Sequence, residues 1–228
     1  MKKIGGPGAI AGLLSFNGGF VDTAGFLGLQ GLFTAHVTGN FVTLGAALVL
    51  GHHGVIGKLL ALPEFVLVIA LARVAGAGLR ARKLPVLRIL LTAEFALLTA
   101  YFAAAVGFGP FPDPDSPLAL LTGFAGIAAM ALQNGLQRVH LASAPPTTIM
   151  TGNTTQATID AVDLLIAPEP AKTAETRARF VRVALSIVYF AAGCAIAATL
   201  YWLVGFWCLG LAVAVGAAAA VMRLEAGA

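Results

Sequence analysis

Charged side chains are scarce in this sequence. Lys, Arg, Asp and Glu make up 11 % of its 228 residues, whereas soluble domains carry roughly 25 %. Hydrophobic residues make up 59 %, and the mean hydropathy is +0.91. This composition excludes an ordinary soluble domain and predicts a protein that resides in lipid. Because no Pro-, Ser- or Gly-rich linker divides the chain, we expect one membrane domain over residues 1–228.

Cysteine and the common catalytic motifs are also scarce or absent. Cys194 and Cys208 both lie in apolar segments without metal-ligand spacing, so we expect packing residues rather than disulfides or a zinc site. No His-Glu-x-x-His, Gly-x-Ser-x-Gly, Walker or Rossmann pattern occurs. We therefore expect no enzyme, no catalytic residue, no bound metal and no cofactor.

The basic residues favour membrane orientation over nucleic-acid binding. The formal charge is +4, but Lys and Arg form short clusters between apolar runs instead of an aromatic-rich basic surface. Apolar runs of about 20 residues, which cross roughly 30 Å of hydrocarbon, predict six transmembrane helices. They lie near residues 8–33, 62–80, 88–106, 118–139, 180–201 and 203–222. The positive-inside rule then places both termini in the cytoplasm.

The tripeptide Thr-Gly-Asn occurs twice, as Thr38-Gly39-Asn40 and Thr151-Gly152-Asn153. Each copy follows a long apolar run and precedes a short segment, 41–50 or 154–166. As helices these segments reach only about 15 to 20 Å at 1.5 Å per residue, so neither can cross alone.

Each half of the chain therefore holds three crossings and one short segment. Because three is odd, the second copy starts on the opposite side of the membrane, and the copies are inverted. The sequence thus predicts an all-α integral membrane protein. Its six transmembrane helices form two inverted three-helix repeats, 1–107 and 108–228, each with a broken or re-entrant short helix after Thr-Gly-Asn.

The two halves also align outside the tripeptides: a one-residue gap sets Asp22 opposite Asn134, and Thr34 lies opposite Thr147. Two motif blocks, 18–27 with 36–40 and 131–135 with 146–153, resemble the YoaK-like family of bacterial membrane proteins. They cover about half the chain. The resemblance implies a six-helix protein of the bacterial inner membrane and a permease-like role without a defined mechanism.

Irregular backbone at membrane depth persists only inside protein or beside a water-filled cavity. The N-terminal ends of the short helices carry positive partial charge, which suits a polar or anionic solute. We therefore predict a transporter or permease of such a solute. The candidate substrate-binding residues are Asp22, His36, Thr38, Gly39, Asn40, Asn134, Arg138, Thr151, Gly152 and Asn153. The alternatives are mere helix caps, a passive channel, or a binding, sensory or scaffold protein without transport.

Several charged residues allow two interpretations each. Asp22 is either a proton site or a hydrogen-bonded structural carboxylate. Arg73 and Glu94 are expected at equal depth on antiparallel neighbours, as a structural ion pair, or else as charges that line a pathway. Arg138 either snorkels to the interface or gates an anion.

Two further expectations concern pairing. Asp160 and Asp163 follow the second tripeptide, where Arg179 or Arg182 can neutralise them. The small-residue runs 75–78 and 191–193 allow close helix contacts within one chain or between the subunits of a homodimer.

Overall fold

The computed structural model describes residues 7–51, 53–166 and 170–222, and this part of the chain is helical without strands. The all-α prediction is therefore confirmed. The elements are α1 (Pro7–Gly28), α2 (Gly39–Leu50), α3 (Val55–Ala81), α4 (Val86–Phe108), α5 (Pro117–His140), α6 (Met150–Ile166), α7 (Pro170–Val204), the 3₁₀ turn η1 (Gly205–Cys208) and α8 (Leu209–Val221).

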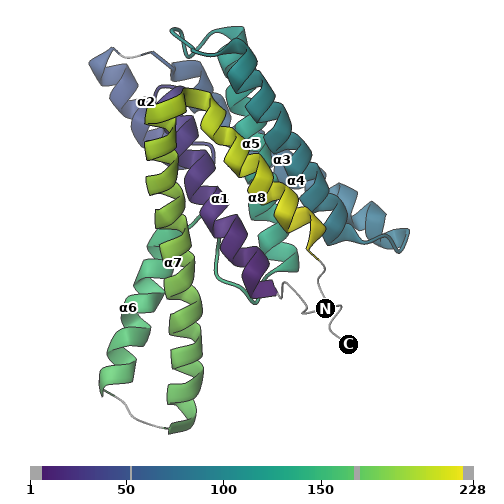
Figure 1. The fold of residues 1–228 in the computed structure, drawn as a ribbon, viewed down its shortest axis with the longest axis vertical. Helices are drawn as coiled ribbons and strands as arrows, with labels where there is room; N and C mark the ends of the chain where they lie inside the picture. The colour runs from purple at the N-terminus through teal and green to yellow at the C-terminus, as the bar shows by residue number, and fades with distance from the viewer. Residues whose placement is uncertain (1–6, 52, 167–169, 223–228) are drawn as a thin grey trace.

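The long helices run alternately up and down between two ends of the molecule (Figure 1). We call the end at which α1 begins and α8 ends the lower end, and the end that carries η1 and the α4–α5 connection the upper end. The hairpin of α6 and α7 extends beyond the other helices at the lower end. The α3–α4 connection and the start of α7 also lie toward this end.

Five segments of the described chain are long and apolar enough to cross a membrane, which agrees with a helical membrane protein. They are Gly8–Gly28, Val55–Ala81, Val86–Phe108, Pro117–His140 and Thr173–Val221. The last segment contains α7, η1 and α8 together. The 13 residues of α8 reach only about 20 Å, so α8 does not qualify as a separate span by length.

The first helix ends earlier than the apolar run predicts. The run continues to about residue 33, but α1 ends at Gly28. Gln30 and Gly31 take left-handed backbone conformations, with φ of 51° and 88°, and the Gly31 N–H donates to the Phe26 carbonyl at 2.8 Å. This arrangement satisfies the last carbonyls of the helix and turns the chain away from it.

Glycines allow α1 and α7 to pack backbone against backbone in the middle of the bundle. A Cβ atom on Gly19 would collide with the Phe190 carbonyl of α7, and one on Gly193 would collide with the Phe16 carbonyl of α1. Close approach of this kind is what small residues provide between helices in lipid, where van der Waals contact replaces the hydrophobic driving force.

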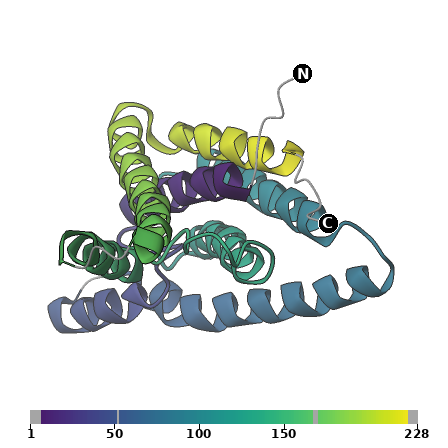
Figure 2. The same cartoon turned by 90° about the horizontal axis from the view of Figure 1, so that it is seen from below.

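Helix α3 lies at one edge of the molecule (Figure 2). Its apolar side chains Val66, Leu67, Leu71 and Val74 are exposed and form a surface suited to lipid. At the upper end α3 is anchored by Asp115, whose carboxylate accepts hydrogen bonds from the N–H groups of residues 54–57 at 3.0 to 3.4 Å. These bonds satisfy N–H groups that the first turn of a helix leaves free.

Replacing Gly193 by Ala is expected to destabilise the protein by about 1 to 3 kcal/mol, because the added methyl group forces α1 and α7 apart. Gly78→Ala is the control, because nothing lies within 4 Å of a Cβ at that helical position. The measurement is thermal unfolding in detergent, followed by tryptophan fluorescence. Equal midpoints for Gly193→Ala and Gly78→Ala would contradict the close contact.

Candidate functional site

Asp22 holds the connection between α1 and α2 against α1. Its Oδ1 accepts hydrogen bonds from the N–H groups of Ala35 at 2.7 Å and His36 at 3.3 Å, and its Oδ2 lies 2.7 Å from His36 Nδ1. The Asp22 side chain is buried, whereas His36 is partly exposed beside Phe190. The structure thus brings two predicted site residues together, and their bonds order the backbone between the helices.

The connection between α5 and α6 is held to α5 in a similar way. Asn134 Oδ1 accepts a hydrogen bond from the Thr148 hydroxyl at 2.6 Å, and Gln133 Nε2 donates to the Thr147 hydroxyl at 3.1 Å. The partners stand 14 residues apart in both bonds, and Asp22 and His36 have the same separation. In the alignment of the two halves Thr148 lies opposite Ala35, whose N–H bonds to Asp22, so the aligned Asp22 and Asn134 contact aligned positions.

Both tripeptide asparagines are buried and bond to the connection that precedes them. Asn40 exchanges two hydrogen bonds with the backbone of Phe33, at 2.9 and 2.8 Å, and Asn153 Nδ2 donates to the Pro146 carbonyl at 2.8 Å. Each partner lies seven residues before its asparagine. Asn153 also lies 3.4 Å from the hydroxyl of Ser186 on α7.

The other tripeptide residues face outward. Thr38 is the N-cap residue of α2, but its side chain makes no capping hydrogen bond. Thr38, Thr151 and Gly152 are exposed, and Gly39 is half-buried. Within the tripeptides, the asparagine amides instead close the preceding loops.

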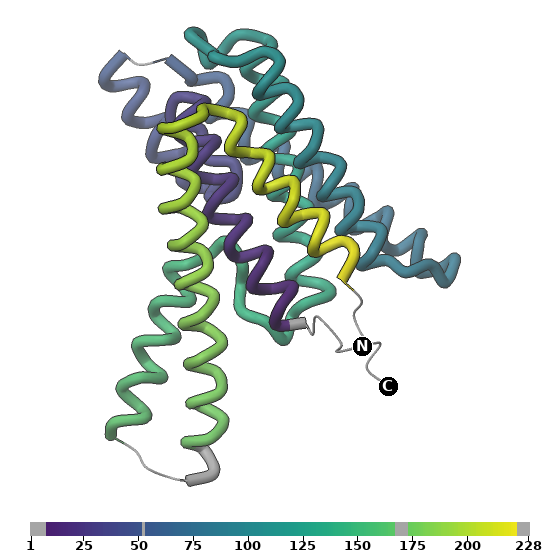
Figure 3. Tube along the Cα trace, viewed as in Figure 1, coloured from purple at the N-terminus to yellow at the C-terminus, as the bar shows by residue number. Residues whose placement is uncertain are grey.

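The two tripeptides do not surround a common space. In the described chain α2 packs only on α3 and α6 packs only on α7, without contact between the two short helices. The trace shows α2 near the upper end and α6 directed toward the lower end (Figure 3). A solute held jointly by Thr38, Asn40, Thr151 and Asn153 has no cavity among those described.

A groove of about 280 Å³ lies between α3 and α5 and contains two of the predicted site residues, Asn134 and Arg138. Its walls are mostly apolar, and Arg80 and His140 line it in the last turns of α3 and α5. The apolar lining includes Phe65, Ile69, Leu90, Leu136 and Ile149, and the basic lining comprises Arg73, Arg80, Arg138 and His140.

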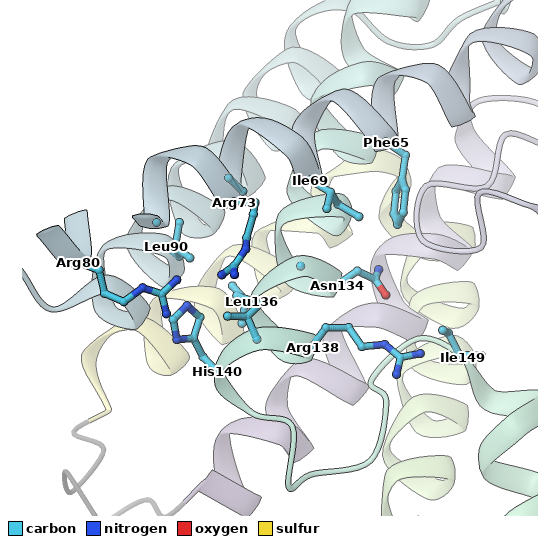
Figure 4. Close-up of a pocket in the computed structure, with 14 residues that line it drawn as sticks. Phe65, Ile69, Arg73, Arg80, Leu90, Asn134, Leu136, Arg138, His140 and Ile149 are labelled. Carbon is cyan, nitrogen blue, oxygen red and sulfur yellow. The ribbon is translucent and has the colours of Figure 1, made fainter. Parts of the chain in front are cut away.

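The basic side chains approach the groove from both helices (Figure 4). Arg73 extends from α3 toward Leu136 on α5, and Arg80 extends toward His140. Arg138 points away from Arg73, toward Ile149. Arg73 lies about 12 Å along the helix axis from Ala81, the last residue of α3. It is therefore a charge within a predicted membrane span, a position that usually marks a solute or ion pathway.

The expected ion pair between Arg73 and Glu94 does not form. The Glu94 carboxylate is 1 % exposed, and neither of its oxygens has a hydrogen-bond partner, whereas Arg73 is exposed at the groove. The reason is rotation about the helix axes: α4 presents Glu94 to the bundle interior, where it packs on α5 and α8, and α3 presents Arg73 to the groove.

The groove arginines lack acidic partners. Among the described residues, no carboxylate lies within salt-bridge distance of Arg73, Arg80 or Arg138. The groove therefore carries uncompensated positive charge at the edge of an apolar cavity. The set of residues that line the groove could not be predicted from the sequence. It depends on contact between α3 and α5, and α4 lies between these two helices in the chain.

Asp160 on α6 forms the expected ion pair with Arg179 on α7. Arg179 Nη2 lies 2.7 Å and Nε 3.0 Å from the two carboxylate oxygens of Asp160, which is fully buried. The hydrogen bonds from Arg179, supported by one from Gln156, hold the pKa of Asp160 below its usual range. The pair joins the hairpin away from the groove.

No cluster of His, Cys, Asp and Glu in the described ranges has an arrangement that could hold a metal ion. Cys194 and Cys208 are both free thiols.

Comparison with known protein families identifies the family of this chain. The sequence profile of DUF1275, described as "Protein of unknown function", matches residues 10–222.

The chain belongs to the DUF1275 family. No curated protein and no solved structure matches it. The match covers both connections and the groove, so the residues described above lie within the matched range. The resemblance to YoaK-like proteins agrees with an uncharacterised family, while the name itself stays a prediction.

In this DUF1275 chain, Asn40→Ala and Asn153→Ala are each expected to lower stability by about 1 to 3 kcal/mol, because each leaves buried backbone groups without partners. Thr38→Ala and Thr151→Ala are the matched controls, since both side chains are exposed. Thermal unfolding in detergent measures the difference. Threonine variants as unstable as the asparagine variants would disprove this division of roles.

The Asp160–Arg179 pair makes stability depend on pH. Because the folded protein lowers the pKa of Asp160, the pair stabilises above the unfolded pKa of the carboxyl, and this contribution is lost as the pH falls through the folded pKa. Wild type should therefore unfold at a higher temperature than Asp160→Asn at neutral pH, with the gap closing in acid. A gap that persists unchanged in acid would exclude the ionic contribution.

Proposed function

We propose that this protein is a transporter or permease that carries a small anionic solute across the bacterial inner membrane, with the groove between α3 and α5 as its binding site. One observation carries the proposal: Arg73, Arg80 and Arg138 border a cavity within the helical bundle and have no carboxylate partner in the described chain. A bound anion would supply the negative charge that compensates these three arginines.

The chemistry of the lining favours an organic anion. Guanidinium groups bind carboxylate, phosphate and sulfonate-like oxygens through paired N–H donors. Asn134 lines the groove beside the apolar side chains of Phe65 and Ile69, and its Nδ2, which donates one hydrogen bond to the Met130 carbonyl, has a second N–H for a solute. A solute with an anionic head and a small apolar body matches both parts.

The packing of the helices supports an inverted repeat. Helix α1 packs on α7 as α5 packs on α3; α2 packs on α3 as α6 packs on α7; and α4 packs on α5 as α8 packs on α1. Replacing α1 to α4 by α5 to α8, and the reverse, converts each contact into its counterpart. The equal seven-residue separations at Asn40 and Asn153 fit the same relation, as do the bonds that join Asp22 to Ala35 and Asn134 to the aligned Thr148.

Inverted repeats are common in secondary transporters, where the solute binds between the repeats and one repeat moves against the other. The groove has this position, because α3 belongs to the first repeat and α5 to the second. In the proposed cycle the anion enters from the lower end past Arg80 and His140 and pairs with Arg73 beside Asn134. The site then opens toward the upper end when the bonds from Asp115, which hold the upper end of α3 beside the start of α5, are released.

The charge distribution supports a cytoplasmic lower end. The connection between α3 and α4 carries Arg82 and Lys83, and the start of α7 carries Arg177 and Arg179, whereas the connection between α4 and α5 carries Asp113 and Asp115. Positive residues stay inside. With α8 as a sixth, short crossing, both termini are cytoplasmic.

The test uses purified protein in liposomes and measures uptake of three labelled anions: inorganic phosphate, methanesulfonate and benzenesulfonate. Sulfonates remain charged and do not leak through lipid as neutral acids. Arg73→Gln should reduce uptake at least about tenfold, because a charge-assisted hydrogen bond contributes about 1.5 to 3 kcal/mol. Arg82→Gln is the control, since Arg82 lies at the end of the same helix outside the groove.

The pattern of uptake also separates the alternatives. Accumulation driven by an ion gradient indicates a carrier, and equilibration alone indicates a passive channel. Binding of the anions without uptake would favour a sensory or scaffold protein. Uptake no faster than in protein-free liposomes for all three anions, or equal uptake by Arg73→Gln and wild type, would disprove the proposed site.

A further inference from the structure

A second polar feature lies inside the bundle, apart from the groove. Helix α1 has a fully or almost fully buried stripe along one side, formed by Ile10, Leu14, Asn17, Val21 and Ala24. The spacing of four and three residues places these side chains on one face of the helix. Asn17 is the only polar member of this stripe.

Helices α4 and α5 have equivalent stripes. On α4 the stripe comprises Leu91, Glu94, Leu98, Tyr101 and Ala105, and on α5 it comprises Ala119, Thr122, Gly126, Ala129, Gln133 and Leu136. Glu94 is 1 % exposed, and Asn17 and Gln133 are 0 % exposed. Each of the three stripes therefore contains one carboxyl or amide side chain.

These three side chains occupy one layer. On α1, Leu14 belongs to an apolar cluster of the lower half and Val21 to one of the upper half. Leu91 and Leu98 divide in the same way around Glu94, and Leu136 and Met130 around Gln133. Asn17, Glu94 and Gln133 thus separate the two apolar clusters of the bundle.

The level of the layer is fixed by direct contacts. Gln133 Nε2 donates to the Leu14 carbonyl at 2.9 Å, which lies beside the helical turn that carries Asn17. A Cβ on Gly126 of α5 would lie 3.3 Å from the Tyr101 ring on α4. Because α4 and α5 run in opposite directions, seven residues from this contact lead to Glu94 on one helix and Gln133 on the other.

The layer contains polar atoms without partners. Both amide atoms of Asn17, both carboxyl oxygens of Glu94 and Oε1 of Gln133 are buried and make no hydrogen bond within the described chain. Such atoms cost free energy unless a proton, a water molecule or an ion satisfies them. A carboxylate in particular is costly in lipid-embedded protein without a countercharge.

The centre of the layer is occupied by side chains and not by helix backbone. Helices α1 and α4 each pack on α5 and α8, but their own backbones do not approach each other in the described structure. They therefore lie across the bundle from one another. Helix α8 presents Gly216 at this level, where a Cβ would lie 2.8 Å from Leu98.

We infer that Glu94, with Asn17 and Gln133, forms a proton-binding site at the centre of the four-helix bundle α1–α4–α5–α8, at which the Glu94 carboxyl takes up and releases a proton. The protonated carboxyl donates its hydrogen bond to bridging water, because no direct hydrogen bond joins it to Asn17 or Gln133. Water bridging to the two amides receives the proton when it leaves. The amide oxygens also stabilise the polar layer in both states.

No positively charged side chain neutralises the Glu94 carboxylate in place of a proton. The helices and turn packed on α4 carry the following charged or titratable groups, together with those of α4 itself: Lys58, Glu64, Arg73, Arg80, Arg88, Tyr101, Arg138, His140 and Cys208. None of them forms a hydrogen bond or an ion pair with Glu94. Helix α8 has no titratable side chain between Leu209 and Val221.

The layer is adjacent to the groove through α5. Gln133 points into the layer, and the next residue, Asn134, lines the groove between α3 and α5. A rotation of α5 therefore changes both sites together. That protonation of Glu94 drives solute movement rests on the proposed transport function, whereas the existence of the proton site does not.

Infrared difference spectroscopy of the protein in lipid films tests the proton site directly. Wild type should show the C=O stretching band of a protonated carboxylic acid in acid buffer, and this band should be lost as the pH is raised. Glu64 on α3 also has a buried carboxyl oxygen without a partner, so the comparison is made in a Glu64→Gln background: Glu64→Gln alone should retain the titrating band, and Glu64→Gln combined with Glu94→Gln should lack it. Asn17→Leu should displace the loss of the band to higher pH, since it removes an amide that stabilises the ionised form.

Each other outcome overturns the inference. A band that stays constant at all pH values would make Glu94 a permanently protonated packing residue, and no difference between wild type and Glu94→Gln would mean that it is always ionised. A loss that follows the Na⁺ concentration instead of pH would assign the layer to a metal cation. If Glu94→Gln does not fold, Glu94→Asp serves instead and should retain a titrating band at a shifted frequency. None of these readouts requires transport.

Discussion

The fold depends on hydrogen bonds that satisfy irregular backbone inside a helical bundle. Two connections, between α1 and α2 and between α5 and α6, interrupt the helices where lipid cannot supply partners for free N–H and C=O groups. Asp22 and Asn134 bind the connections from the preceding helices, and Asn40 and Asn153 bind them from the following ones. These contacts close the loops that precede α2 and α6, and the helices that follow, α3 and α7, pack on α5 and α1 respectively.

The elements of the fold could largely be predicted from hydropathy, because each long helix is a continuous apolar run. The two short helices and the correspondence of Asp22 with Asn134 were also predictable, since they rest on a repeated tripeptide and a constant spacing. The sixth crossing was not settled in this way, because α7 and α8 form one apolar stretch and the length of α8 alone does not decide it.

The site was less predictable, because side-chain direction depends on rotation about the helix axis. Equal depth suggested that Arg73 and Glu94 pair, but α4 turns Glu94 toward the interior and α3 turns Arg73 toward a groove. The threonine of each tripeptide has good capping chemistry, yet Thr38 makes no capping bond because the loop is closed by the asparagine instead. Glu94 lies in a series of buried residues spaced three and four apart on α4. This spacing is visible in the sequence and could have shown that Glu94 faces the interior.

The anchoring of α3 by Asp115 has a mechanical consequence. The upper end of this helix is fastened by several N–H bonds to one carboxylate, whereas much of its length lies against lipid and its lower part borders the groove. Hydrocarbon tails are as apolar as the leucines and valines they would replace. While the Asp115 bonds hold, α3 can therefore tilt about its upper end. Lipid tails would then replace contacts of its lower part with protein at little cost in free energy.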